Sequence, residues 1–244
     1  MDIEKKLRRV EQELAYVRAE YEEYCSAISH DFAGPLRAMG GFSEIILSNN
    51  EAVFDEKTKR HFDIILNSAK DGKMMLDVTR QFSHLPRSNA PFKDFGCEAL
   101  VASVLLPLIE LTGKSDAKVN VEKLPRITGD KEQIRLVFYH LLKNALTYCH
   151  PTEVTLINVS ALDHDEFVEF QISDNGIGVP KKMDERIFQI LKRAVSPKDY
   201  PGHGMGLAIA KKIVHRHGGE IQLLRDISEQ TVFSFTLSKA PIAL

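Results

Sequence analysis

Apolar residues recur at alternating steps of three and four along the start of the chain, and this spacing limits the fold more than any other feature. The positions are Leu7, Val10, Leu14, Val17, Tyr21, Tyr24 and Ile28, with Glu, Lys and Arg between them. Such a repeat is typical of the seam of a coiled coil. A single amphipathic helix lying on its own domain is the alternative, and the unbroken repeat favours self-association.

The apolar stripe continues through Phe32, Pro35, Met39, Phe42 and Ile46. At about 100° per residue these positions lie within about 40° of Ile28, whereas His30 falls about 200° away. We therefore expect His30 on the solvent-exposed face. A lone helical histidine is usually a bystander. Here Pro35 follows the His30-Asp31 pair and removes a backbone donor, and a helix with no function at this point would seldom carry that cost.

A second helical pattern follows a polar break at residues 48–57. Its positions are Phe62, Ile65, Ala69, Gly72, Leu76, Thr79 and Phe82. Two helices joined by a short loop form a hairpin, and one hairpin cannot bury both stripes. We therefore expect two chains to form a homodimeric four-helix bundle. Residues 84–92 contain two prolines among polar residues, which predicts a linker.

After the linker the pattern changes from helices alone to helices and strands. Helices are predicted over 97–111, 129–149 and 204–219, and Asp130 is the expected N-cap of the second. Strands are predicted over 118–124, 153–162, 166–174, 219–226 and 231–238. This order predicts an α+β chain in which a two-layer α/β sandwich follows the helical hairpin. The expected regions are a coiled-coil signalling helix over 1–24, a hairpin over 25–88 and a catalytic domain over 89–244.

The composition favours neither nucleic acid nor a membrane as a partner. The formal net charge of the 244 residues is -2, which gives no general attraction to polyanions. No apolar run reaches the roughly 18 residues of a membrane span, and the charged N-terminus is unlike a signal peptide. Cys25, Cys97 and Cys149 show no metal-binding spacing and suit a reducing compartment. We therefore expect a cytoplasmic protein.

Two motifs after the predicted linker contain a side-chain oxygen that could bind a ligand. Asn144 lies in the middle of a predicted helix, where asparagine is a poor helix former, and its side-chain oxygen suits Mg²⁺. Asp174 ends a predicted strand and is followed by Gly176 and Gly178. A carboxylate there can accept a hydrogen bond from the exocyclic amine of adenine, whereas guanine presents a carbonyl. A helix-surface asparagine and a simple turn are the alternatives.

A third motif, Gly202, Gly204 and Gly206, leads directly into the last predicted helix. Free backbone N–H groups at a helix N-terminus attract phosphate. By itself this motif is weak, and its spacing differs from the P-loop and from the dinucleotide fingerprint. In this order, the three motifs resemble the ATP-binding fold shared by sensor histidine kinases, Hsp90, gyrase B and MutL. The resemblance implies a mobile lid over about residues 180–203.

The stretch around His30 distinguishes among these relatives. "SHDFAGPLRAMGGFSEII" resembles the phosphoacceptor box of two-component histidine kinases through His30, Asp31, Pro35 and Leu36. Residues 185–219 are most similar to the phytochrome-type branch of that family, in particular at Phe188, Arg193, Tyr200 and Pro201. The resemblance covers nearly the whole chain after the first 20 residues.

The resemblance implies a role for each matching residue. His30 would attack the γ-phosphate of ATP, and Asp31 would accept the proton of the other ring nitrogen. Asn144 would hold Mg²⁺, and Asp174 would read adenine. The other nucleotide-binding positions would be His140, Tyr148, Gly176, Gly178, Arg193, Gly202, Gly204, Gly206 and Thr231. Among these, Arg193 would contact the γ-phosphate and Thr231 would support Asp174.

The resemblance also implies partners and an activity. The partners would be the receiver domain of a response regulator, a second copy of the chain, and an upstream sensor domain or sensor partner. The expected activity is autophosphorylation of His30 and transfer to an aspartate of the regulator. A degenerate kinase acting as a phosphotransfer hub or scaffold is one alternative, and a conformational ATPase like Hsp90 or MutL is another.

Five positions depart from the family pattern, one of which is Ala33 in place of a common basic residue. His140, Thr147 and Gln230 stand where many members have Asn, Lys and Gly. Gly34 replaces the Thr, Asn or Gln with which many members position a hydrolytic water. Since glycine has no side chain to hold that water, we expect little phosphatase activity.

Overall fold

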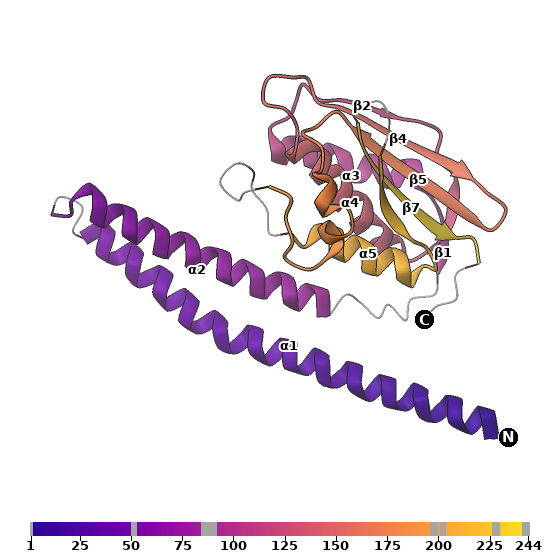
Figure 1. Ribbon diagram of the computed structural model, residues 1–244, viewed down its shortest axis with the longest axis horizontal. Helices are drawn as coiled ribbons and strands as arrows, with labels where there is room; N and C mark the ends of the chain where they lie inside the picture. Colours follow the sequence, from indigo (N-terminus) through magenta and orange to yellow (C-terminus); the bar gives the residue numbers. More distant parts are fainter. Residues whose placement is uncertain are drawn as a thin grey trace. The chain divides into compact units, whose positions relative to one another are not determined.

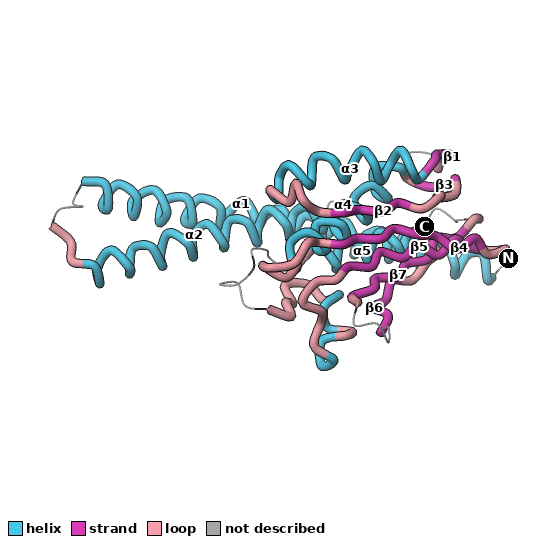
Figure 2. Tube along the Cα trace, turned by 90° about the horizontal axis from the view of Figure 1, so that it is seen from above, coloured by secondary structure: helices cyan, strands magenta, loops and turns pink. Residues whose placement is uncertain are grey.

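The computed structural model describes residues 2–49, 53–83, 92–195, 200, 204–225 and 230–240. The chain divides into two compact units, residues 1–87 and 88–244. In the N-terminal unit, α1 (Asp2–Asn49) and α2 (Glu56–Ser83) form an antiparallel hairpin (Figures 1 and 2). α1 continues through Pro35, because a proline removes one hydrogen bond from a long helix that keeps the others. The predicted linker lies outside the described residues except for Phe92.

Small side chains line the contact between the two helices of the hairpin. Among the described side chains, those buried in this unit are Cys25, Ser29, Ser43, Leu66 and Ala69. A Cβ on Gly72 of α2 would lie 3.1 Å from the Leu36 side chain of α1. The helices therefore pack closely, but they bury few large apolar groups against each other.

The large apolar side chains of α1 are left in solvent. The exposed members of the predicted stripe are Leu7, Val10, Leu14, Val17, Tyr21, Tyr24, Phe32, Met39, Phe42 and Ile46. Their spacing follows the predicted seam, and α2 does not cover them. The stripe is thus an exposed apolar face in the single chain, and its pairing with a second chain stays a prediction.

The C-terminal unit is a sheet covered on one face by helices (Figure 1). Its strands are β1 (Lys93–Gly96), β2 (Lys118–Val121), β3 (Arg126–Gly129), β4 (Leu156–Asp163), β5 (Phe167–Asp174), β6 (Ile221–Arg225) and β7 (Thr231–Ser238). Its helices are α3 (Cys97–Thr112), α4 (Lys131–Thr147) and α5 (Gly206–Arg216), with the 3-10 turns η1 (Lys181–Met183) and η2 (Arg186–Phe188). The predicted α+β class is therefore confirmed.

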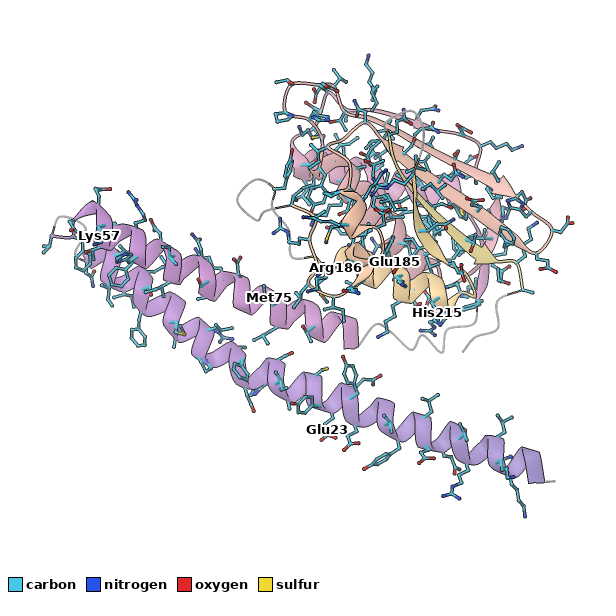
Figure 3. The ribbon with its side chains drawn as sticks, viewed as in Figure 1. Glu23, Lys57, Met75, Glu185, Arg186 and His215 are labelled. Atoms are coloured by element: carbon cyan, nitrogen blue, oxygen red, sulfur yellow. The ribbon has the colours of Figure 1, made fainter. Side chains whose placement is uncertain are left out.

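The main sheet has the strand order β2-β4-β5-β7-β6, in which β2 and β4 are parallel and the other pairs are antiparallel. β1 and β3 pair separately. η2 packs against α5, and Figure 3 labels Arg186 and His215 on these two elements. In the strand order of the main sheet, β5 is the central strand. Its last residue, Asp174, lies at the end of the strand, where loops can form a site.

An aromatic cluster joins the helices to the sheet. Phe138 of α4 meets Phe170 and Phe235 edge-on, with ring centroids 5.5 Å and 5.4 Å away. The latter two rings stack at 5.1 Å, because Phe170 and Phe235 are directly paired across β5 and β7. Asp130 accepts hydrogen bonds from the N–H groups of Glu132 and Gln133, which confirms it as the N-cap of α4. This cluster and cap fix α4 against the sheet.

The three helices and five strands predicted after the linker are confirmed, with differences of a few residues at their ends. β1 and β3 were not predicted, because each has only four residues and no long alternating pattern. No helix among the described residues is both long and apolar enough to span a bilayer.

Candidate active site

His30 and Asp31 lie side by side on an exposed face of α1. His30 Nδ1 is 3.2 Å from Asp31 Oδ1, and the two side chains are 90% and 77% exposed. Helical spacing predicted this exposure. Since the carboxylate engages Nδ1 and favours a hydrogen there, Nε2 is the nitrogen available to a reactant from solvent.

One face of α4 joins the motifs of the C-terminal unit. His140, Asn144 and Tyr148 follow at four-residue steps, which places them on the same side of the helix. At one end, a Cβ on Gly206 would lie 2.9 Å from His140 Nδ1. At the other end, the Ile177 N–H donates to the Tyr148 carbonyl at 2.9 Å. The half-buried Asn144 therefore lies between the start of α5 and the turn that follows β5.

The turn after β5 is too tight for a side chain at its first glycine. The Gly176 N–H donates to Asp174 Oδ1 at 2.9 Å, and a Cβ on Gly176 would lie 2.3 Å from the Tyr148 carbonyl oxygen. Gly178 has a φ of 72° and, together with Thr231, lines a hollow of about 320 Å³. The D-x-G-x-G motif thus brings backbone close to α4 and borders a recess at the edge of the sheet.

Asp174 and Thr231 are buried neighbours in the β5–β7 ladder. Burial raises the pKa of the Asp174 carboxyl to about 6, against the opposing effects of the Gly176 N–H and the nearby Thr231 hydroxyl. Thr231 Oγ1 is buried and forms no hydrogen bond of normal geometry within the described part of the chain. An acceptor and a hydroxyl held this way fit a planar ligand edge with both a donor and an acceptor, as in adenine.

The N-terminus of α5 is suited to an anion. The N-cap residue, Met205, supplies no side-chain hydrogen bond, so the first N–H groups of the helix lack an acceptor from a cap. Gly204 has a φ of 70°, and a Cβ there would lie 2.5 Å from the Lys192 carbonyl oxygen. The predicted Gly202 lies outside the described residues. Uncapped N–H groups behind a glycine segment fit a phosphate.

Tyr200 connects the predicted lid to the end of α4. Arg193 donates from Nη2 to the Tyr200 carbonyl at 2.5 Å, and the Tyr200 hydroxyl donates to the Cys149 carbonyl at 3.2 Å. The Tyr148 and Tyr200 rings lie 5.5 Å apart. Sequence reasoning missed Cys149 in this arrangement, because no local pattern signals a contact between residues 51 positions apart.

The described residues of the predicted nucleotide site therefore belong to the C-terminal unit, while His30 and Asp31 belong to the hairpin. Asn144 remains a predicted Mg²⁺ ligand. Within the described ranges, no group of three or more His, Cys, Asp or Glu side chains is placed to hold a metal ion.

Comparison with known families supports this grouping of motifs. Residues 129–241 match the histidine kinase-, DNA gyrase B- and HSP90-like ATPases. This segment of the chain belongs to that ATPase family. The homologues of the chain include phytochrome-type, SasA and CikA histidine kinases. Cyanobacterial phytochrome B of Nostoc sp. is 30% identical over 234 residues, which are 95% of this chain and 31% of that protein.

A second relative of the chain is the adaptive-response sensory kinase SasA of Synechocystis sp.. It is 26% identical over 241 residues, which cover 95% of the chain and 62% of SasA. The chain thus spans 31% of the phytochrome and 62% of SasA, so each of these relatives is longer than the chain.

Solved structures share the fold of the chain. Full-length ShkA in complex with AMPPNP matches with a TM-score of 0.61 and 20% identity, over 91% of this chain and 47% of that one. The histidine kinase ThkA in complex with the response regulator protein TrrA matches with a TM-score of 0.59 and 21% identity, over 90% and 62%. Both contain the predicted succession of helical region and mixed α/β domain.

Proposed function

We propose that the chain is a histidine protein kinase that autophosphorylates His30 from Mg-ATP and transfers the phosphoryl group to an aspartate of a response regulator. The observation that carries the proposal is the exposed His30–Asp31 contact in a chain whose C-terminal unit contains an ATPase-family domain. A histidine in this setting has a free ring nitrogen and the access to solvent that a nucleophile needs.

His30 and Asp31 divide the chemistry of the first step. The lone pair of Nε2 attacks the γ-phosphorus, so a nitrogen–phosphorus bond forms while the bond to the ADP oxygen breaks. The attack leaves positive charge on the ring. Asp31 accepts the Nδ1–H hydrogen bond while this charge develops, which raises the basicity of the attacking nitrogen, as the aspartate of a catalytic triad orients its histidine. Asp31 then takes this proton once the nitrogen–phosphorus bond has formed, which leaves the ring neutral.

The C-terminal unit would hold the nucleotide. Asp174 would accept a hydrogen bond from the adenine amine, with Thr231 beside it, and Gly204 and Gly206 would let phosphates approach the N-terminus of α5. Asn144 would hold Mg²⁺ together with phosphate oxygens and water, and the ion would neutralise phosphate charge. The likeness to the fold of ShkA, which was solved with AMPPNP, supports nucleotide binding.

Arg193 would contact the nucleotide after its hydrogen bond to the Tyr200 carbonyl is broken. Its guanidinium is engaged by the Tyr200 carbonyl, and an exchange of that carbonyl for the γ-phosphate would replace a neutral acceptor with an anionic one. Tyr148 and His140 would border the same site from α4.

The exposed stripe of α1 supports a homodimer, since these side chains lie in solvent in the single chain. A receiver domain as partner is supported by the shared fold with ThkA, whose structure contains a response regulator protein. Input would come from a sensor domain or a sensor partner. The proposed location is the cytoplasm, where ATP is available.

The decisive experiment is incubation with γ-labelled ATP and Mg²⁺, followed by treatment with acid and alkali. Phosphohistidine is acid-labile and alkali-stable, so the label should disappear only in acid. His30→Gln should abolish this label, because the nucleophile is lost while the nucleotide site on the other unit stays intact. His61→Gln, which changes an exposed histidine of α2, is the matched control and should keep the label.

Two outcomes would overturn the proposal. Normal labelling of His30→Gln would place the acceptor among the other histidines. Nucleotide binding without any label in the wild type would favour the scaffold alternative.

A further inference from the structure

His140 and His217 both belong to the C-terminal unit, and they differ in burial and in their hydrogen bonds. His217 is buried, whereas His140 is half-buried. His217 Nδ1 lies 2.8 Å from the Ile213 carbonyl oxygen, and its Nε2 accepts from the Asp130 N–H at 3.1 Å. Both nitrogens of that ring are satisfied in the neutral form. Neither ring nitrogen of His140 forms a hydrogen bond within the described part of the chain. The half-buried His140 ring therefore has its nitrogens available to a ligand.

The His140 ring lies at the place where the fold is prepared for an anion. Its Nδ1 is 2.9 Å from the position of a Cβ on Gly206, the first residue of α5. α5 has 11 residues and no side-chain cap, so its first N–H groups point out of the helix without a capping acceptor. The unpartnered ring and the uncapped helix are independent observations, and one phosphate oxygen or two would satisfy both.

The surroundings keep the ring neutral while the site is empty. Burial lowers the pKa of His140 to about 4, and the charge of Lys143 one turn later acts in the same direction. The ionisable side chains shown to act on the ring are both on α4: Tyr139, whose ring centroid lies 5.3 Å away, and the cation Lys143. Since the charge of Lys143 disfavours a second cation, an anion is what reverses the preference for a neutral ring.

We propose that His140 takes up a proton when the phosphate chain of a nucleotide binds beside it, so that nucleotide binding is coupled to protonation of this residue. The inference rests on the proposed function and deepens it, because it assigns a charge change to one residue of the proposed nucleotide site. The proton passes from solvent to the ring nitrogen that lacks one. The imidazolium then has two N–H donors, and one of them donates to a phosphate oxygen in a charge-assisted hydrogen bond.

The coupling has a defined sign. Bound phosphate raises the pKa of His140 above its value in the empty site, so the nucleotide binds more tightly as pH falls between the bound and the free pKa. Asp174 has the opposite effect, because its ionised form accepts the adenine amine and is lost as pH falls through about 6. At a pH above the pKa of Asp174, the pH dependence of nucleotide binding therefore reports mainly on His140.

The test is calorimetric titration of the full chain with Mg-ADP, in buffers whose ionisation enthalpies differ. The slope of the observed enthalpy against the buffer enthalpy gives the number of protons taken up. We expect roughly half a proton per ADP at about pH 6.5, and a Kd that protonation of His140 makes about twofold tighter at about pH 6.5 than at about pH 7.5. Adenosine has no phosphate and should bind without this uptake.

The matched variant is His140→Asn, whose amide can still donate a hydrogen bond but cannot titrate. It should bind Mg-ADP with a weaker affinity and without proton uptake. If it does not bind measurably, the ring carbon signals of the labelled wild type decide: the His140 signal should move to its cationic position with Mg-ADP, while that of His217 stays neutral.

Several outcomes would overturn the inference alone: binding of Mg-ADP without proton uptake, uptake that persists in His140→Asn, equal uptake with adenosine, or a His140 ring that stays neutral. Absence of any Mg-ADP binding would instead overturn the proposed function, and the inference with it.

Discussion

The two units of the chain use large apolar side chains in opposite ways. In the C-terminal unit, Phe138 is 0% exposed and makes contact with two further buried rings. In the hairpin, Phe42 is 66% exposed, and the buried contact between the helices consists largely of small side chains. The C-terminal unit buries its apolar groups internally, whereas the hairpin leaves them exposed in the single chain. On the proposed homodimer, this difference ties the stability of the hairpin to assembly, but not the stability of the C-terminal unit.

The same substitution in both units gives the largest expected contrast. Phe138→Ala should lower the free energy of unfolding of the C-terminal unit by about 3–5 kcal/mol, because it removes a ring from a closed core. Phe42→Ala should leave that unit unchanged and lower the stability of the hairpin in proportion to dimer dissociation. Urea unfolding at several protein concentrations checks both. A concentration-independent loss for Phe42→Ala would contradict the comparison.

Two tyrosines of α1 test whether position on the stripe, and not exposure, decides assembly. Tyr24 and Tyr16 are 65% and 68% exposed, but only Tyr24 belongs to the predicted seam. Tyr24→Glu should weaken the dimer by about 3 kcal/mol, or roughly a hundredfold in Kd, since a charge replaces an apolar contact in both chains. Tyr16→Glu should leave the dimer unchanged. Sedimentation measures both, and equal effects would place the interface elsewhere.

Asp174 extends the comparison to a buried polar group of the C-terminal unit. The folded pKa of about 6 lies above the model-compound value of 3.8, so the stabilising effect of the protonated carboxyl is present below about pH 4 and lost as pH rises to about 6. Asp174→Asn should therefore stabilise the nucleotide-free protein by about 2 kcal/mol at neutral pH. The same change should weaken ATP binding by about 1–3 kcal/mol, because a charge-assisted hydrogen bond is lost.

Urea unfolding without nucleotide, at about pH 4 and about pH 7.5, checks the sign for Asp174→Asn, and competition between ATP and GTP checks its role in recognising adenine. Asp165→Asn, at an exposed turn of the same unit, is the control and should change neither quantity. A destabilised Asp174→Asn variant at neutral pH would show that the carboxylate is satisfied by the empty site.

Glycines give the smallest effect and again differ between the units. A Cβ on Gly34 meets nothing within 4 Å, so Gly34→Ala should stabilise α1 by about 1 kcal/mol through helix propensity alone. Gly176→Ala should destabilise the C-terminal unit, because its Cβ would overlap the Tyr148 carbonyl oxygen. Thermal unfolding of both variants is the measurement. A loss of stability in Gly34→Ala would mean that this position is covered in the dimer.

The sequence alone determined the features that depend on local periodicity and on motif order. The stripe of α1, the exposure of His30, the helix N-cap at Asp130 and the five strands of the main sheet could all be predicted, because each is set by neighbours within a few residues. The family followed from the order of three short motifs and the stretch around His30, although each glycine motif is weak by itself. Even so, the short β1 and β3 strands escaped prediction, since their pairing is not encoded in either segment.

Only the tertiary structure decided how the side chains of the site are satisfied. The link from Arg193 through Tyr200 to Cys149, the raised pKa of Asp174 and the unpartnered ring of His140 depend on groups that are distant in sequence. Burial and hydrogen bonding are sums over all neighbours in space, and a sequence pattern reports only the neighbours along the chain. For this reason the residues of the site could be named from the sequence, while their charge states and partners could not.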